Sequence, residues 1–172
     1  MISIKFSFVL LATAVLFAAY QAPAQDEVFS DSNVDYSFTL PEAKWKMTSK
    51  PSPTSPNVEY VYGYRSDGHL EVRKVPVEKT SILADVLLDE ETKLKFRPGF
   101  VAGKEENFVG KIRGSVFNFE YVASGRSMSG RFYFLRANDT TVYVLRFTGQ
   151  KDSLRSLRNQ TDAIARTFGV KQ

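Results

Sequence analysis

The 172-residue chain contains no cysteine and only one histidine, His69. The lack of cysteine excludes a disulfide framework, a thiolate-bound zinc or iron–sulfur site, a cysteine nucleophile and a lipid-modified N-terminal cysteine. A single histidine excludes a histidine-rich metal cage. Tryptophan is limited to Trp45, whereas phenylalanine and tyrosine are plentiful, at 14 and 8 residues. We therefore expect an aromatic and aliphatic core, with no cofactor and no covalent cross-link.

Residues 1–24 have the pattern of a secretory signal peptide. Lys5 supplies the positive charge, and the 14 residues from Phe6 to Ala19 are almost unbroken apolar sequence. That run is shorter than the roughly 20 residues needed to span a bilayer. Ala22-Pro23-Ala24 is a small-residue cleavage signature, so we predict cleavage after Ala24 and a periplasmic or secreted protein. An uncleaved N-terminal anchor is the alternative. No second long apolar run follows, so we expect no transmembrane span after cleavage.

The remainder of the chain is typical of one domain, and no internal repeat is visible. Residues 25–33 are polar, and we expect them to be flexible, followed by an α+β domain over 34–172. Period-two alternation and turn residues predict the strands, and helical spacing predicts two helices. The predicted strands cover 34–40, 58–64, 69–75, 100–111, 115–123, 131–137 and 141–148, the predicted helices cover 81–96 and 151–168, and extended loops or turns cover 48–57 and 124–130.

The turns between these strands are short, which favours an antiparallel sheet. The two helices must cover sheet faces in order to bury their apolar stripes. The later strands carry apolar residues on both faces, so the sheet is expected to be covered on both sides. The predicted fold is therefore a single α+β domain with an antiparallel sheet of about six or seven strands flanked by two main helices.

Three segments carry a resemblance to a known family. Tyr36-Ser-Phe-Thr-Leu-Pro41, with Trp45 shortly after it, is similar to a first strand and turn. Val142–Thr148, followed by a helix ending in Ile164–Phe168, is similar to a last strand and closing helix, and Asn107, Gly110 and Gly114 fit loosely between them. On these residues the chain resembles the PsbP-like superfamily over about residues 34–168. That superfamily includes the extrinsic proteins of photosystem II, DcrB-type bacterial envelope proteins and a eukaryotic Ran-binding import factor.

The resemblance implies an antiparallel sheet flanked by helices and an accessory or binding role. Many bacterial members are lipoproteins, and this chain departs from them by lacking cysteine. The metal-binding positions of the photosystem proteins have no match here, so no calcium, manganese or chloride role is carried over. The matching segments are hydrophobic patterns without chemistry of their own, and the fold does not by itself assign a function.

The sequence contains no catalytic or metal-binding motif that we recognise. Gly125-Arg-Ser-Met-Ser129 differs from the hydrolase pattern G-x-S-x-G only in having serine in place of the second glycine, and it lies in a predicted turn between strands. The glycine spacing of Gly125 and Gly130 fits a phosphate loop, but no Lys-Ser/Thr pair follows. His69 lies near Asp67 and Glu71, but these residues alone are weak evidence for a metal site, which needs three or four converging ligands. We therefore predict no catalytic residue and no metal ligand.

The charges of the two halves of the chain differ in sign. Residues 26–110 carry 11 basic and 15 acidic residues, and residues 111–172 carry 11 basic and 4 acidic residues. Arg126, Arg131, Arg136 and Arg146 lack obvious local partners. They either pair with acidic residues of the first half across the sheet or form a patch for an anionic partner, such as a lipid surface or an acidic protein.

An aromatic group is the second candidate binding site. Trp45, Tyr60, Tyr62 and Tyr64 either line a pocket for an apolar ligand or form a sheet face that is packed in the core. The leading functional hypothesis is an exported, non-catalytic accessory protein that binds a protein or an envelope component. A carrier of a small apolar ligand and an unrecognised enzyme are the alternatives. Export and the modest net charge of +4 disfavour a nucleic-acid partner.

Overall fold

The computed structural model describes residues 26–171, so the predicted signal peptide at 1–24 lies outside the described residues. The strands are β1 (Glu27–Ser30), β2 (Tyr36–Leu40), β3 (Trp45–Ser49), β4 (Val58–Tyr62), β5 (His69–Pro76), β6 (Val101–Phe108), β7 (Gly114–Ala123), β8 (Arg126–Asn138), β9 (Thr141–Gln150) and β10 (Gly169–Val170), and the helices are α1 (Leu83–Leu94), α2 (Lys151–Ser156) and α3 (Arg158–Thr167). Across this part of the chain, no helix has the length and apolar character needed to cross a lipid bilayer.

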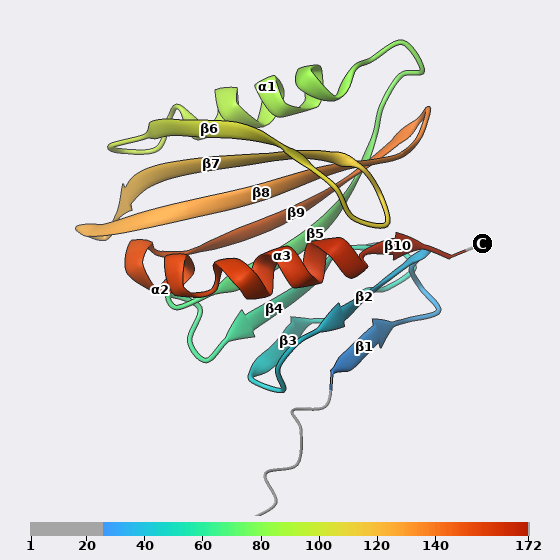
Figure 1. Ribbon diagram of the computed structural model, residues 1–172, viewed down its shortest axis with the longest axis horizontal. Helices are drawn as coiled ribbons and strands as arrows, with labels where there is room; N and C mark the ends of the chain where they lie inside the picture. The colour runs from blue at the N-terminus through green and yellow to red at the C-terminus, as the bar shows by residue number, and fades with distance from the viewer. Residues whose placement is uncertain (1–25, 172) are drawn as a thin grey trace, which may run out of the picture.

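The strands form two sheets. Seven strands follow the order β3-β4-β5-β9-β8-β7-β6, with every neighbouring pair antiparallel, and β1, β2 and β10 form a smaller sheet. Figure 1 shows α1 on one side of the long strands and α2 and α3 on the other. The predicted α+β class, with an antiparallel sheet of six or seven strands, is confirmed.

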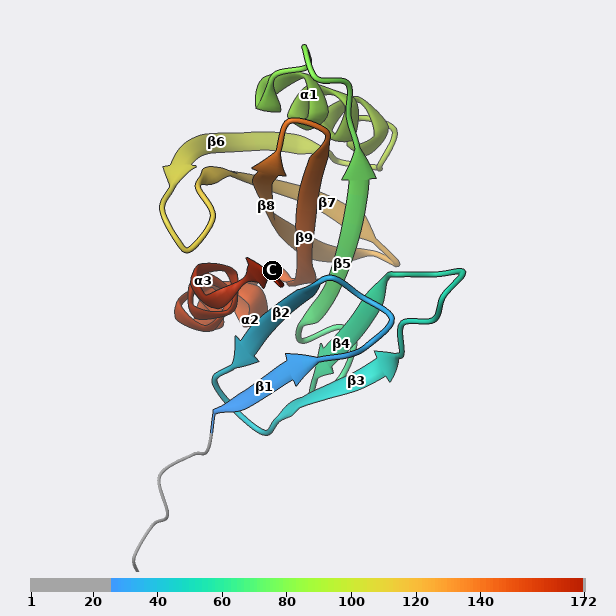
Figure 2. The same cartoon turned by 90° about the vertical axis from the view of Figure 1, so that its right-hand side faces the viewer.

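Successive side chains in the middle of β8 point to opposite faces of the large sheet, and they are apolar on both faces. Phe132 and Phe134 lie in a cluster with residues of α1, whereas Tyr133 and Leu135 lie in a second cluster with residues of α2, α3 and the small sheet. All four side chains are at most 4% exposed. Figure 2 shows α1 above this sheet and the small sheet below it. The molecule is therefore layered, with an apolar core on each side of the large sheet.

The first strand, β1, forms where we expected a flexible segment over 25–33. Phe29 is only 5% exposed, and its ring stacks on that of Phe38 with 4.8 Å between centroids. These two residues are also partners in the antiparallel pairing of β1 with β2. One buried aromatic ring and four paired residues thus order a polar segment that shows no alternation of its own.

The turn between β7 and β8 is shorter than the predicted segment 124–130. Only Ser124 and Gly125 connect the strands, and both have positive φ, at 49° and 69°. Two positive φ values are typical of the type I′ turn, whose twist matches that of a hairpin. Ser127 and Ser129 consequently lie within β8, so the near-match to the hydrolase pattern has no strand-to-helix turn.

Two further elements differ from the prediction. β3 covers Trp45–Ser49 and pairs with β4, so the proline-rich loop begins later than residue 48. The predicted terminal helix over 151–168 is divided at Leu157 into α2 and α3. Leu157 is 4% exposed, so the break fits this side chain into the core while both helices remain on the sheet.

Candidate functional site

The face of the large sheet that packs against α1 changes character along the strands. On β9, Val142 and Val144 lie in the core under α1, and the next side chains on the same face are Arg146 and Thr148. β5 is the antiparallel partner of β9, and it places Glu71 opposite Arg146. The helix covers only the apolar end of this face. A cavity of about 520 Å³ lies at the polar end, and α1 forms one wall.

Charged groups dominate the cavity, which five cationic side chains and two carboxylates line. The lining residues are Arg65, His69, Glu71, Arg73, Glu90, Lys93, Leu94, Arg97, Tyr121, Phe132, Arg146 and Thr148. Glu59, which lies next to the cavity, pairs with Arg65 and His69. When Glu59 is included, cations still outnumber carboxylates by five to three. The cavity is therefore electropositive, and its size is within the ordinary range for small-molecule sites.

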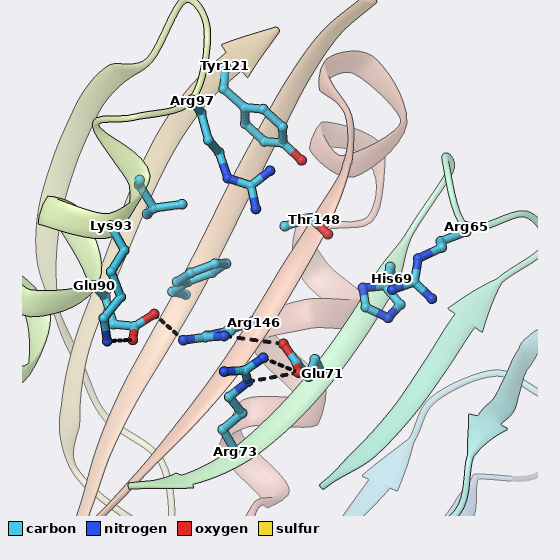
Figure 3. A pocket seen from close by; sticks show the side chains of 12 residues that line it. Arg65, His69, Glu71, Arg73, Glu90, Lys93, Arg97, Tyr121, Arg146 and Thr148 are labelled. Carbon is cyan, nitrogen blue, oxygen red and sulfur yellow. Dashed lines mark hydrogen bonds and ion pairs between the residues drawn. The ribbon is translucent and has the colours of Figure 1, made fainter. Parts of the chain in front are cut away.

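The two lining carboxylates hold three of the cations in one chain of ion pairs (Figure 3). Glu71 accepts from Arg73 Nη2 at 2.7 Å and from Arg146 Nη1 at 3.3 Å. Glu90 accepts from Lys93 Nζ at 3.1 Å through one carboxylate oxygen and binds Arg146 Nη2 through the other. Glu90 is 6% exposed, so its charge needs these partners. The chain of ion pairs fixes Arg146 between α1 and β5.

One of the three guanidinium nitrogens of Arg146 has no hydrogen bond to any residue in the described part of the chain. Both terminal nitrogens of its guanidinium are paired, but the buried Nε has no hydrogen-bond partner among the described residues. The guanidinium also lies over the ring of Phe132, at 5.6 Å from the centroid. A buried donor without a partner carries a desolvation cost that an acceptor from a ligand removes.

Arg97 is the most available cation of the cavity. It follows the end of α1, is exposed, and lies over the ring of Tyr121 at 4.7 Å from the centroid. Within residues 26–171 no carboxylate lies within ion-pair distance of Arg97. Figure 3 shows its guanidinium extending from the helix side of the cavity toward Thr148. Burial raises the pKa of Tyr121, so this ring stays neutral beneath the cation.

His69 and Glu59 form the far edge of the site. His69 Nε2 lies 2.8 Å from Glu59 Oε2, which also accepts from Arg65 Nη1 at 3.2 Å. The hydrogen bond to His69 and the positive charge of Arg65 lower the pKa of Glu59. Glu59 is therefore an anion at neutral pH and holds both neighbours at the mouth of the cavity.

The structure does not bring the four arginines of the suggested basic patch together. Arg131 lies on the opposite face of the sheet from Arg146, where it donates to Asp162 at 2.8 Å and to Asn118 at 2.7 Å. Arg136 donates to the backbone oxygens of Ser81 and Asp139. Arg126 is exposed at the start of β8. Of the four, only Arg146 lines the cavity, and its partners are acidic residues of the first half of the chain.

The aromatic candidates are also dispersed. Trp45 is 1% exposed and Tyr60 is 3% exposed, and both belong to the core on the α3 side of the sheet. The indole nitrogen of Trp45 donates to Gln160 at 2.9 Å. Tyr62 packs at the edge of this core, whereas Tyr64 is 78% exposed beyond the end of β4. None of the four lines the cavity beside α1.

Most of the cavity residues are not among those expected from the sequence, although the order of residues along two strands carries a signal for them. On β9, residues 142, 144, 146 and 148 read Val, Val, Arg, Thr, and on β5, residues 75, 73, 71 and 69 read Val, Arg, Glu, His. On both strands, the side chains that point to this face of the sheet thus change from apolar to charged or polar along the strand. A core-facing row with charges at one end indicates that the covering helix stops short.

The available groups favour anion binding over metal binding. Among residues 26–171, no group of three or more histidine, aspartate or glutamate side chains is placed to hold a metal ion. The cavity carboxylates each have cationic partners, whereas Arg97 and the Nε of Arg146 still have donors to offer. Guanidinium groups suit carboxylate and phosphate ligands because they present several N–H donors in one plane.

No family model matches the sequence, and a search of curated proteins finds no significant match. Similarity is found in the fold. LpqN of Mycobacterium tuberculosis, described as involved in cell envelope biogenesis, aligns with a TM-score of 0.58 at 15% identity, over 89% of this chain and 88% of that one.

Two other solved structures extend this similarity. The Ran-binding protein Mog1p of Saccharomyces cerevisiae aligns with a TM-score of 0.62 at 11% identity, over 86% of this chain and 96% of its own. Cyanobacterial PsbP from Synechocystis aligns with a TM-score of 0.59 at 10% identity, over 88% and 95%. The chain therefore has the PsbP-like fold that Mog1p shares, as the sequence resemblance indicates.

Proposed function

We propose that the protein is an exported, non-catalytic binding protein that recognises an anionic component of the cell envelope in the cavity beside α1. The observation that carries this proposal is the excess of positive charge around an open cavity, with Arg97 unpaired among the described residues. Electropositive clefts attract anionic ligands and hold them by charge-assisted hydrogen bonds. The folds of LpqN and Mog1p, described as an envelope biogenesis protein and a Ran-binding protein, are compatible with a binding role.

Charge selectivity tests this proposal directly. Three ring-bearing probes of similar size carry different charges: benzoate is negative, benzamide is neutral and benzylamine is positive. At millimolar concentration we expect only benzoate to raise the melting temperature, by about 2–4 °C, because only a ligand of the folded state stabilises it. Added salt is expected to reduce the shift.

Matched variants show whether such binding occurs in the cavity. Arg97→Gln removes the available cation and is expected to abolish the benzoate shift. Arg155→Gln is the control, because Arg155 is an exposed residue of α2 whose partner is Asp152. Equal shifts with all three probes, or a benzoate shift that survives in Arg97→Gln, contradict the proposed site.

An enzyme is the second candidate, because His69 and Glu71 line the same cavity as the cations. Histidine and carboxylates are the usual groups for general acid–base catalysis. Incubation with p-nitrophenyl acetate and p-nitrophenyl phosphate separates the candidates. We expect both probes to remain intact. Release of nitrophenolate that is lost in His69→Gln overturns the non-catalytic proposal and supports the enzyme.

Export is the other part of the proposal. N-terminal sequencing and intact mass of the protein recovered outside the cytosol are expected to give a chain that begins at Gln25. A chain that retains Phe6–Ala19 contradicts cleavage and supports the N-terminal anchor.

A further inference from the structure

We propose that the ligand in this cavity carries a phosphate monoester group on an apolar body. The inference rests on the anion-binding function proposed above and narrows it to one chemical class. Arg97, the Nε of Arg146 and Thr148 would hold the phosphate, and Leu94 and Phe132 would contact the apolar body.

The balance of charge favours a dianion. Glu71 and Glu90 already compensate much of the charge of Arg73, Arg146 and Lys93 in the chain of ion pairs. With five cations against three carboxylates, Glu59 included, the site retains an excess of two positive charges. A phosphate monoester carries nearly two negative charges at neutral pH and matches this excess better than a single carboxylate does.

The directions of the donors favour a tetrahedral group. The side chain of Arg97 comes from the segment after α1, and those of Arg146 and Thr148 come from β9. Arg97 approaches from the helix side of the cavity, while Arg146 and Thr148 rise from the sheet (Figure 3). A planar carboxylate is satisfied by the fork of one guanidinium, whereas phosphate presents oxygens in three directions to donors from several elements.

The buried Nε of Arg146 is the second observation that points to an acceptor. Its two terminal nitrogens are committed to Glu71 and Glu90, so this donor is fixed in place. Buried donors in folded proteins nearly always have a partner. The Nε atom has less than 1 Å² of accessible surface, so an oxygen of the ligand reaches it only after the neighbouring side chains shift.

The size and the apolar walls indicate more than a free phosphate ion. A cavity of about 520 Å³ is far larger than one phosphate group, and Leu94, Phe132 and Tyr121 give it an apolar side. Leu94 and Phe132 are at most 5% exposed, so each offers the ligand only the small part of its side chain that faces the cavity. Contact with these side chains is expected to favour an ester with an apolar or aromatic group over inorganic phosphate.

Calorimetric titration of the purified protein with phenyl phosphate tests the inference. We expect one site, with an affinity about tenfold or more above that for inorganic phosphate or benzoate. Arg97→Gln is expected to weaken phenyl phosphate binding at least about tenfold, and Thr148→Val a few fold. Arg155→Gln, which alters a cation outside the cavity, is expected to bind as the unmodified protein does.

Sedimentation with vesicles distinguishes a lipid headgroup from a soluble ester. Binding to phosphatidylcholine vesicles that contain phosphatidic acid, but not to phosphatidylcholine alone, supports a headgroup if Arg97→Gln abolishes it. Binding of phenyl phosphate without vesicle binding supports a soluble phosphate ester.

Two results overturn the inference in distinguishable ways. Benzoate binding equal to or tighter than phenyl phosphate binding, with both dependent on Arg97, contradicts the phosphate class while the proposed anion-binding function stands. Failure of every anionic probe to bind contradicts both the phosphate class and the proposed function. Circular dichroism of Arg97→Gln serves as the folding control, since Arg97 is exposed and removing it leaves the core intact.

Discussion

Arg146 shows how one side chain links stability to the site. Its guanidinium is held by Glu71 of β5 and Glu90 of α1, and it stacks over Phe132 of β8. Its side chain is 15% exposed, so the ion pairs are largely buried away from water. Two carboxylates fix the charge of Arg146 in place and also reduce the positive potential that a ligand experiences. The residue therefore serves both the packing of α1 and the electrostatics of the cavity.

Glu90→Gln separates these two effects. We expect the free energy of unfolding to fall by about 1–3 kcal/mol, because Arg146 keeps only one charged partner. We also expect phenyl phosphate to bind about threefold to tenfold more tightly, because a negative charge has left the cavity. Urea unfolding and calorimetric titration measure the two changes. Glu91→Gln is the control, since Glu91 pairs with Lys95 and does not line the cavity. Weaker binding in Glu90→Gln contradicts the account.

A second residue-scale prediction concerns pH and Asp35. Tyr143 donates to Asp35 Oδ1 at 2.6 Å, and Lys74 donates to Oδ2 at 2.5 Å. Burial would raise the pKa of Asp35, but these hydrogen bonds outweigh burial and hold the pKa below its ordinary value of 3.8. The charged carboxylate therefore stabilises the fold above about pH 4, and this stabilisation is lost as the pH falls through the lowered pKa.

Asp35→Asn is accordingly expected to lower the free energy of unfolding by about 1 kcal/mol at pH 7. The difference from the unmodified protein is expected to shrink as the pH falls below about 4. Urea unfolding curves over this pH range measure it, with Asp89→Asn, at an exposed position of α1, as the control. A difference that stays constant down to pH 2.5 rules out a contribution from the charge of Asp35.

At the scale of elements, helix α3 is fixed to the sheet by one polar cluster as well as by its apolar stripe. Asp162 of α3 accepts from Arg131 Nη2 at 2.8 Å and from the hydroxyl of Tyr133. Arg131 is 7% exposed and Tyr133 is fully buried. Loss of the carboxylate leaves a buried cation with only neutral partners, Asn118 and Tyr133.

Asp162→Ala is therefore expected to lower the free energy of unfolding by about 3 kcal/mol. Asp152→Ala removes the corresponding partner from an exposed pair with Arg155 and is expected to cost less than about 0.5 kcal/mol. Guanidinium unfolding of both variants measures the contrast. Equal losses in the two variants refute the structural role of the Asp162 cluster.

The elements that sequence reasoning predicted are those with a repeating pattern. The strands around Phe38 and Phe119 alternate between apolar and polar residues, and the strands around Phe132 and Val144 are apolar runs between turn residues. β1 and β3 were missed because each buries only one side chain, Phe29 or Trp45, and so shows no alternation. Pairing with the neighbouring strand supplies the order that their own sequences do not encode.

The candidate site was largely hidden from the sequence because its parts are distant along the chain. Glu71, Glu90 and Arg146 meet only after β5 pairs with β9 and α1 packs on the sheet. The sequence does indicate Arg146 as a candidate, together with the possibility that it pairs with acidic residues of the first half. The role of Arg97 depends on where α1 ends, and helix boundaries are poorly determined by pattern.

At the scale of the whole molecule, the opposite charges of the two halves meet across the large sheet. Arg146 of the basic half pairs with Glu71 and Glu90 of the acidic half, and Arg158 pairs with Glu106. Much of the difference in charge between the two halves is therefore compensated by ion pairs within the fold. The cavity beside α1 keeps a local excess of positive charge. Our central claim is that this excess binds an anionic ligand.

Nuclear magnetic resonance tests that claim most directly. In a titration of the ¹⁵N-labelled protein with phenyl phosphate, the account predicts saturable shifts of the backbone amides of Arg97, Tyr121, Arg146 and Thr148. It predicts little change in α2 and α3, which lie across the sheet (Figure 2). Shifts confined to α2 and α3, or no saturable shift at any amide, would contradict an anion-binding cavity beside α1.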